Sequence, residues 1–174
     1  MGQQVIVDNR AGANGNIAAE IVAKSPGDGY TLSTVAMGHA INPLIYRKLP
    51  YDGTADFTPI SLIASSPYVL IVNPSVAATS VREFIALAKS KPGALYYGTG
   101  GTGGAPHLAT EMLRTMAGLE LVHVPYKTIV FALIDTMAGQ VQFSFSVLPA
   151  ALPMVKQGKL RALGVTSLTR SSLA

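Results

Sequence analysis

Short apolar runs and longer stretches with helical spacing alternate along this chain, with few residues between them. Apolar runs of this length predict strands, and apolar positions three and four apart predict amphipathic helices. The expected strands are 5–7, 30–36, 60–63, 68–72, 94–97, 121–124, 141–145 and 161–166, and the expected helices are 17–24, 40–49, 106–117, 129–138 and 150–157. Because strands alternate with helices of this length, the pattern predicts an α/β fold around a parallel sheet with right-handed crossovers.

A capping box marks the start of a further helix at SVRE, residues 80–83. The Ser80 hydroxyl is expected to accept a hydrogen bond from the amide of Glu83, and the Glu83 side chain is expected to reach back. The apolar positions that share one face of this helix are Val81, Phe84, Ile85 and Ala88. Their spacing predicts that this face is buried.

A cluster of glycines, GTGGTGG at 98–104, lies between the expected strand 94–97 and the expected helix 106–117. A glycine-rich turn at this place exposes free main-chain N–H groups at the positive end of the helix dipole, which predicts an anion-binding pocket. The glycines also let the backbone approach a ligand closely, because they have no Cβ. The loops at the carboxyl ends of the strands, 98–105, 125–128 and 146–149, should converge on one site.

The composition limits the class of protein. A chain of 174 residues suits one domain or two small lobes, and 49% apolar with 13% charged residues excludes a disordered chain. No apolar run approaches the roughly 20 residues of a membrane span, so no direct membrane insertion is expected. The net charge of +4 is scattered, so nucleic acid is not an expected partner. The absence of cysteine excludes disulfides and thiolate catalysis.

The glycine cluster also permits an alternative function, a nucleotide-binding α/β enzyme that uses the Gly98–Gly103 loop. Its spacing, Gly98-x-Gly100-x-x-Gly103, matches the dinucleotide fingerprint between a strand and a helix. That fingerprint needs an acidic residue at the end of the next strand to bind the ribose. The strand is followed by Lys127, and Glu120 lies at its other end, so this requirement is not met.

Catalytic constellations are missing from the sequence. It has no nucleophile elbow, P-loop or zinc-protease motif. His39, His107 and His123 are far apart and carry no metal-ligand spacing. His107, in the first turn after the glycine cluster, is either a local backbone partner or a ligand contact, whereas His123 is expected to be a packed or rim histidine. We therefore expect no enzyme activity, no cofactor and no metal.

Ordered segments along the whole chain resemble one protein family. They are VDNRAGANGNI (7–17), PGDGYTL (26–32), HAINP (39–43), LPYD (49–52), DFTPI (56–60), VNP (72–74), the 98–107 loop, VPYK (124–127), AGQV (138–141) and GKLRAL (158–163). In this order they resemble the Bug family of extracytoplasmic solute receptors, the substrate-binding proteins of tripartite tricarboxylate transporters.

The resemblance implies a type II periplasmic binding protein-like fold, with two lobes and parallel-core sheets. The implied lobes are 1–72, a partial first lobe completed by 161–174, and 73–160, a second lobe. Residues 161–174 form the return strand and the start of a linker. The family's N-terminal strand and its glycine/proline-rich loop would precede Val5, and its C-terminal part would follow Ala174. We therefore expect a receptor truncated at both ends, with its first lobe incomplete.

The same resemblance implies periplasmic capture of a small carboxylate without covalent chemistry, with a membrane permease of a tripartite tricarboxylate transporter as partner. The expected ligand-binding residues are Thr99, Gly100, Gly101, Thr102, Gly103, Gly104, His107, Ala36, Met37, Gly38, His39, Lys127, Thr128 and Ser146. Two departures from the family pattern matter. Thr128 begins an apolar stretch where the family has Gly-Ser-x-Pro, and Ser146 stands where acidic residues are common. Without that acid, we expect a plain carboxylate rather than an amino acid as ligand.

Overall fold

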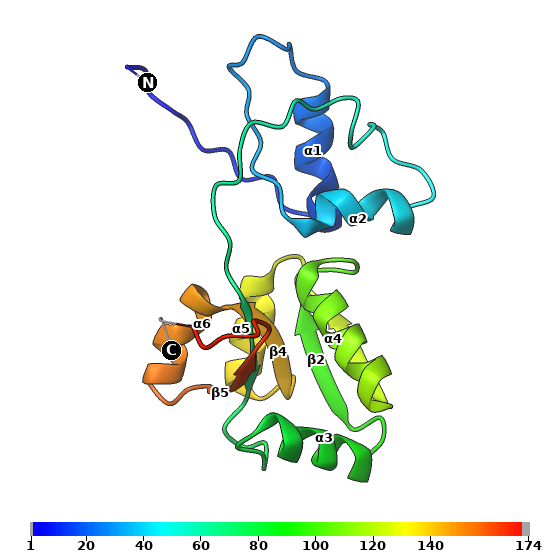
Figure 1. Ribbon diagram of the computed structural model, residues 1–174, viewed down its shortest axis with the longest axis vertical. Helices are drawn as coiled ribbons and strands as arrows, with labels where there is room; N and C mark the ends of the chain where they lie inside the picture. Colours follow the sequence, from blue (N-terminus) through cyan, green and yellow to red (C-terminus); the bar gives the residue numbers. More distant parts are fainter. Residues whose placement is uncertain (1, 172–174) are drawn as a thin grey trace. The chain divides into compact units, whose positions relative to one another are not determined.

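The computed structural model describes residues 2–171, and the chain divides into two compact units, Met1–Pro59 and Ile60–Ala174. The division falls before strand β1 (Tyr68–Val72), whereas the sequence placed the lobe boundary after it. The last strand, β5 (Arg161–Val165), pairs with β1 inside the second unit. Figure 1 shows the elements of each unit.

The second unit is built on a five-stranded sheet with the order β3-β2-β4-β1-β5. The remaining strands are β2 (Leu95–Thr99), β3 (Leu121–Pro125) and β4 (Phe143–Val147). Strand β2 pairs in parallel with both β3 and β4, which confirms the parallel core predicted from the sequence. Strand β1 pairs antiparallel with β4 and β5, so it runs against the other described strands and the sheet is mixed.

Four helices of the second unit lie close to their expected bounds. They are α3 (Val81–Ser90), α4 (Ala105–Ala117), α5 (Ile129–Ala138) and α6 (Leu148–Lys156). Gly118 and Gly139 follow α4 and α5 in the left-handed conformation, which is the usual way for glycine to end a helix. Each of α4, α5 and α6 follows the carboxyl end of a strand, as the alternating pattern predicted.

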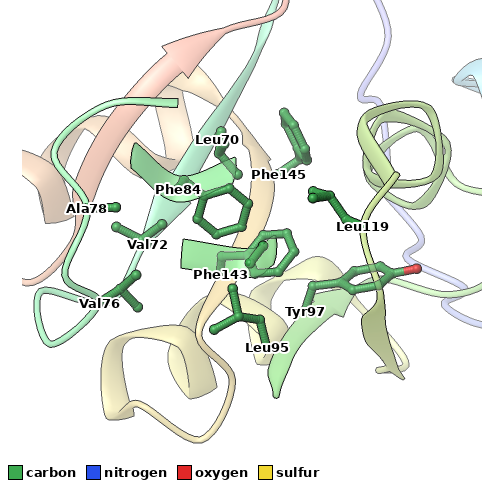
Figure 2. Packing of buried hydrophobic residues seen from close by; sticks show 11 residues of the cluster. Leu70, Val72, Val76, Ala78, Phe84, Leu95, Tyr97, Leu119, Phe143 and Phe145 are labelled. Atoms are coloured by element: carbon green, nitrogen blue, oxygen red, sulfur yellow. The ribbon is translucent and has the colours of Figure 1, made fainter. Parts of the chain in front are cut away.

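Both faces of the sheet are buried. Side chains of β1 alternate between them, so Leu70 and Val72 belong to one hydrophobic cluster and Val69 and Ile71 to the other. The first cluster includes residues of α3 and is flanked by α4, and Figure 2 shows how its aromatic rings pack, with Leu70, Val72, Val76, Ala78, Phe84, Leu95, Tyr97, Leu119, Phe143 and Phe145 labelled. The second cluster is covered by α5 and α6. Burial on both sides explains why β1 reads as a continuous apolar run.

The capping box at the start of α3 is confirmed, with one difference. The Ser80 hydroxyl accepts from the Glu83 amide at 3.2 Å, as expected. The Glu83 carboxylate accepts from the amide and hydroxyl of Thr79, at 2.7 and 2.8 Å, one residue before the expected partner. These hydrogen bonds lower the pKa of Glu83. Phe84 and Ala88 are buried, so the predicted apolar face is the face that packs.

The first unit contains a short 3₁₀ helix (Ala13–Gly15), α1 (Asn16–Ala23) and α2 (Met37–Ile45). Buried amides join them. The Asn42 amide donates to the Asn16 side chain at 2.6 Å and accepts from the Asn14 amide at 2.7 Å.

Three predicted strands, 5–7, 30–36 and 60–63, are wrong. These segments pair with no strand among the described residues, and their apolar side chains lie exposed; Ile6 and Leu62 are each 85% exposed. A strand needs a neighbour for its backbone hydrogen bonds, and an apolar run alone does not supply one.

Candidate functional site

The segment Gly100–Gly104 connects β2 to α4, and we call it the glycine loop. Helix α4 begins after Gly104 with no side-chain cap. No hydrogen bond joins the amides of Thr102 and Gly104 to an acceptor in the described chain. In the first turn, the amides of Ala105 and His107 have no acceptor in the preceding turn of the helix. The glycine loop therefore presents main-chain donors at the positive end of a 13-residue helix.

Two other amides of the glycine loop already have partners. The Gly101 amide donates to the Thr99 hydroxyl at 3.2 Å, and the Gly103 amide donates to Nδ1 of His107 at 3.3 Å. The Thr99 hydroxyl also lies 2.7 Å from Nε2 of His123, and Thr99 is 1% exposed. A hydroxyl contact to the ligand was expected from Thr99 or Thr102, and in the structure the Thr99 hydroxyl is buried and accepts from the Gly101 amide.

The start of α5 packs against the same loop. A Cβ on Gly100 would lie 2.8 Å from the Ile129 amide nitrogen, and a Cβ on Gly98 would lie 2.9 Å from the Cβ of Ala132. Only glycine fits at these two positions without moving α5. Thr128 precedes α5 and makes no side-chain cap hydrogen bond. The N-termini of α4 and α5 therefore both adjoin the glycine loop without side-chain caps.

Ser146 lies near the carboxyl end of β4, two positions beyond Ser144 on the same face. Ser144 pairs with Gly98 and donates its hydroxyl to the Gly98 carbonyl at 2.8 Å. The Ser146 hydroxyl, on a residue that is 1% exposed, has no hydrogen-bond partner among the described residues. Buried hydroxyls rarely lack a partner, so this one needs an explanation. Because β2 and β4 are parallel and Ser144 pairs with Gly98, Ser146 lies two residues further along, on the side of Gly98 that leads to Gly100.

A stack of three rings lies on the other face of β2, next to α4. The Tyr97 and His123 rings are 4.8 Å apart at 19°, and the His107 and His123 rings are 4.4 Å apart. The Tyr97 hydroxyl donates to Glu111 at 2.8 Å, and Glu111 forms a 2.7 Å ion pair with Arg114. This stack contacts the glycine loop at both ends, through Thr99 and through Gly103.

Burial shifts the ionisation of this stack. It lowers the pKa of His107, and it lowers the pKa of His123, with the charge of His107 as a further cause. Burial also raises the pKa of Tyr97. Burial alone would raise the pKa of Glu111, but the hydrogen bonds from Arg114 and Tyr97 outweigh it, so that pKa is lowered. The neutral imidazole is therefore favoured at both histidines.

The structure brings together the expected residues of the second unit and places the others in the first unit. Lys127 is exposed just before α5, beside Thr128. Ala36, Met37, Gly38 and His39 form the start of α2 in the first unit. The His39 ring lies 2.9 Å from the Gly53 carbonyl and stacks on Tyr51. A ligand contact by these four residues stays a prediction.

Sequence reasoning missed the part that His123 plays. It was expected to be a packed or rim histidine, and its ring is indeed packed, but it also contacts the Thr99 hydroxyl. The parallel register places His123 directly beside Tyr97, so a correct alignment of β2 and β3 could have found this pairing. Among the described residues, no helix is long and apolar enough to span a membrane, and no group of three or more His, Asp or Glu could hold a metal ion.

Comparisons with known proteins point to a family of receptors. The chain matches the family model described as "Tripartite tricarboxylate transporter family receptor" over residues 1–173. It is 35% identical to Protein BugT of Bordetella pertussis over 174 residues, which are 99% of this chain and 53% of BugT. The chain spans about half the length of the curated relatives it matches.

Two solved structures carry ligands in their descriptions. The chain is similar to R. palustris Rpa4515 with adipate, with a TM-score of 0.93 and 43% identity over 97% of this chain and 57% of that one. It is also similar to MatC from Rhodopseudomonas palustris with bound malate, with a TM-score of 0.83 and 27% identity over 91% of this chain and 54% of that one. These matches confirm the fold class that the sequence resemblance implied.

Proposed function

The chain belongs to the tripartite tricarboxylate transporter receptor family, and we propose that it binds a small carboxylate and releases it unchanged. The observation that carries this proposal is the meeting of two uncapped helix N-termini at one glycine loop, those of α4 and α5. Positive helix ends and unpaired amides attract an anion without a charged side chain. Adipate and malate, named with the two solved relatives, are both dicarboxylates.

One carboxylate of the ligand is proposed to lie at the glycine loop. Its oxygens accept from the amides of Thr102 and Gly104 and from the first turn of α4, and the Ser146 hydroxyl is proposed as a further donor. Hydrogen bonds to a charged group contribute about 1.5–3 kcal/mol each, so three of them contribute about 4.5–9 kcal/mol, which is comparable to the roughly 8 kcal/mol of micromolar binding. Exposed Lys127 adds positive charge beside the start of α5.

The neutral character of this site favours a simple carboxylate over an amino acid. Ser146 offers a hydroxyl where the family resemblance implies an acid, and a hydroxyl binds an ammonium group less strongly than a carboxylate does. We further propose that the receptor works in the periplasm and delivers its ligand to the membrane permease of a tripartite tricarboxylate transporter. The family match supports both of these statements, and it covers about half the length of the relatives.

Calorimetric titration of the chain with adipate and with malate tests the proposal. We expect binding of one or both, no binding of hexane-1,6-diol, which has the adipate skeleton without charge, and no binding of NAD. Recovery of the ligand unchanged after incubation supports a receptor. Binding of NAD alone, or conversion of the bound acid, contradicts the proposal.

A matched pair of glycine variants localises the site. Gly101 has φ +124° and Gly93 has φ +69°, and a Cβ on either residue would meet nothing within 4 Å. Gly101→Ala and Gly93→Ala therefore both introduce a strained backbone without a clash, but only Gly101 belongs to the glycine loop. We expect both variants to lower the unfolding temperature and only Gly101→Ala to weaken adipate binding. Equal affinities of the two variants contradict this placement.

A further inference from the structure

The histidine pair His107 and His123 contacts both ends of the glycine loop. His123 lies 2.7 Å from the Thr99 hydroxyl where the loop begins, and His107 accepts from the Gly103 amide near its end. We propose that the histidine pair holds the loop in its ligand-binding shape only while His107 is neutral, so that ligand is released at mildly acidic pH. The inference deepens the proposed function and rests on it, but the coupling between the rings and the loop can be measured separately.

The hydrogen bond from Gly103 depends directly on the charge of His107. Nδ1 of His107 accepts this bond, so the neutral ring carries its proton on Nε2. An imidazolium has a proton on each nitrogen and accepts nothing. Protonation of His107 therefore removes the partner of the Gly103 amide. Gly103 is buried and has φ +84°, so its amide cannot simply turn to water while the loop keeps its shape.

Protonation of His123 leaves the other end of the loop in place. The Thr99 hydroxyl serves as acceptor for the Gly101 amide and lies 3.2 Å from the Gly101 carbonyl, in addition to its contact with His123. One hydroxyl proton has to be shared among these partners. A protonated His123 can only donate to the hydroxyl, whose own proton then goes to the Gly101 carbonyl while its oxygen still accepts from the Gly101 amide. The pH-sensitive contact of the loop is therefore the one at His107.

The charged groups around the histidine pair decide how it takes up protons. From α4, Glu111 faces His107, but its carboxylate is already bonded to Arg114 and to the Tyr97 hydroxyl of β2. With the rings 4.4 Å apart, two imidazolium charges repel each other. The pair therefore binds its two protons in separate steps, and burial places both steps below the usual range of histidine.

An imidazolium close to the ligand would also attract it, and this effect opposes release. The histidine pair stacks with Tyr97 on the α4 side of the sheet. Gly98 and Gly100 face α5 on the opposite side, because successive residues of a strand alternate between its two faces. Ser146 shares the α5 side, since its neighbour Ser144 bonds to Gly98. The proposed switch requires that the loss of the loop shape outweighs this attraction, so that affinity falls as the pH decreases.

Adipate affinity between about pH 8 and about pH 4, a range that extends below the usual titration of histidine, tests this inference. The matched variant is His107→Asn with His123→Gln, because asparagine places an acceptor near the Nδ1 position, glutamine places a polar atom near the Nε2 position, and neither titrates. We expect the wild-type affinity to fall at least about tenfold more than that of the variant over this range. Because the same ligand is used with both proteins, its own protonation cancels.

Two outcomes overturn the inference. Parallel pH profiles show that the histidine pair does not control the loop, and a wild-type affinity that rises relative to the variant shows that charge attraction dominates. If the double variant fails to fold, NMR of the wild type replaces it: the Gly103 amide shift must titrate together with the His107 ring. Without binding at any pH the proposed function fails, but this NMR titration still decides whether the rings hold the loop.

Discussion

Replacing Ser146 by alanine should have opposite effects on stability and on binding. The Ser146 hydroxyl is buried without a partner among the described residues, and such a group costs about 1–3 kcal/mol of stability. Alanine removes the oxygen and leaves only a small void, so we expect a net gain of about 1 kcal/mol for the ligand-free protein. For a chain of this length, that gain raises Tm by roughly 2–4 °C.

The same substitution removes a proposed donor to the ligand. A hydrogen bond to a carboxylate contributes about 1.5–3 kcal/mol, so adipate affinity should fall by about 10- to 100-fold. Thermal unfolding with and without adipate measures both effects on one sample, and calorimetry gives the affinity. The variant should therefore unfold at a higher temperature than wild type without ligand and gain less from ligand addition.

Ser144→Ala is the matched control. Ser144 lies on the same strand and the same face, is equally buried, and donates to the Gly98 carbonyl at 2.8 Å. Loss of that bond should destabilise the protein by about 0.5–1.5 kcal/mol, opposite in sign to Ser146→Ala. If Ser146→Ala also destabilises the ligand-free protein, the hydroxyl has an internal partner. If adipate binds the Ser146 variant as tightly as wild type, the hydroxyl does not contact the ligand.

Three further results are expected. Gly100→Ala should lose stability and adipate affinity, because the new Cβ would lie 2.8 Å from the Ile129 amide nitrogen. Gly27→Ala, where a Cβ meets nothing within 4 Å, should change neither, and equal Tm values of the two variants refute the close approach. Burial lowers the pKa of both histidines in the folded state, so the stability that the histidine pair contributes is fully present above about pH 6.5 and is lost as the pH falls toward their pKa values in the folded protein. Measurement of Tm against pH tests this loss, and a wild-type profile as flat as that of the His107→Asn/His123→Gln variant contradicts it. Phe84→Ala should lower the free energy of unfolding, measured in urea, by about 3–5 kcal/mol, because Phe84 is fully buried against Phe143. A loss under about 1 kcal/mol would mean that the hydrophobic cluster repacks around the missing ring.

Local sequence signals predicted the helices of both units well, but three of the predicted strands are wrong. Helices are determined by signals close together in the sequence, which are capping residues, glycines at the C-terminus and the spacing of apolar positions. For this reason α5 has its expected bounds and the Ser80 cap is present. A strand depends instead on a distant partner. The segments 30–36 and 68–72 were both predicted to be strands, but only the second finds neighbours, β4 and β5. The direction of β1 was also beyond the reach of local patterns, since alternation with helices predicts parallel strands.

The candidate site shows the same limit at the level of single atoms. The sequence located the glycine loop, because glycines between a strand and a helix permit close approach and can leave amides free. It could not tell which amides stay free, since that depends on side chains that arrive from elsewhere. The Gly103 amide donates to His107 and the Gly101 amide donates to Thr99, whereas the amides of Thr102 and Gly104 are the ones proposed to bind a ligand. A site made of main-chain donors is therefore tuned by the residues that occupy some of them, and in this chain one of those residues is a histidine that titrates.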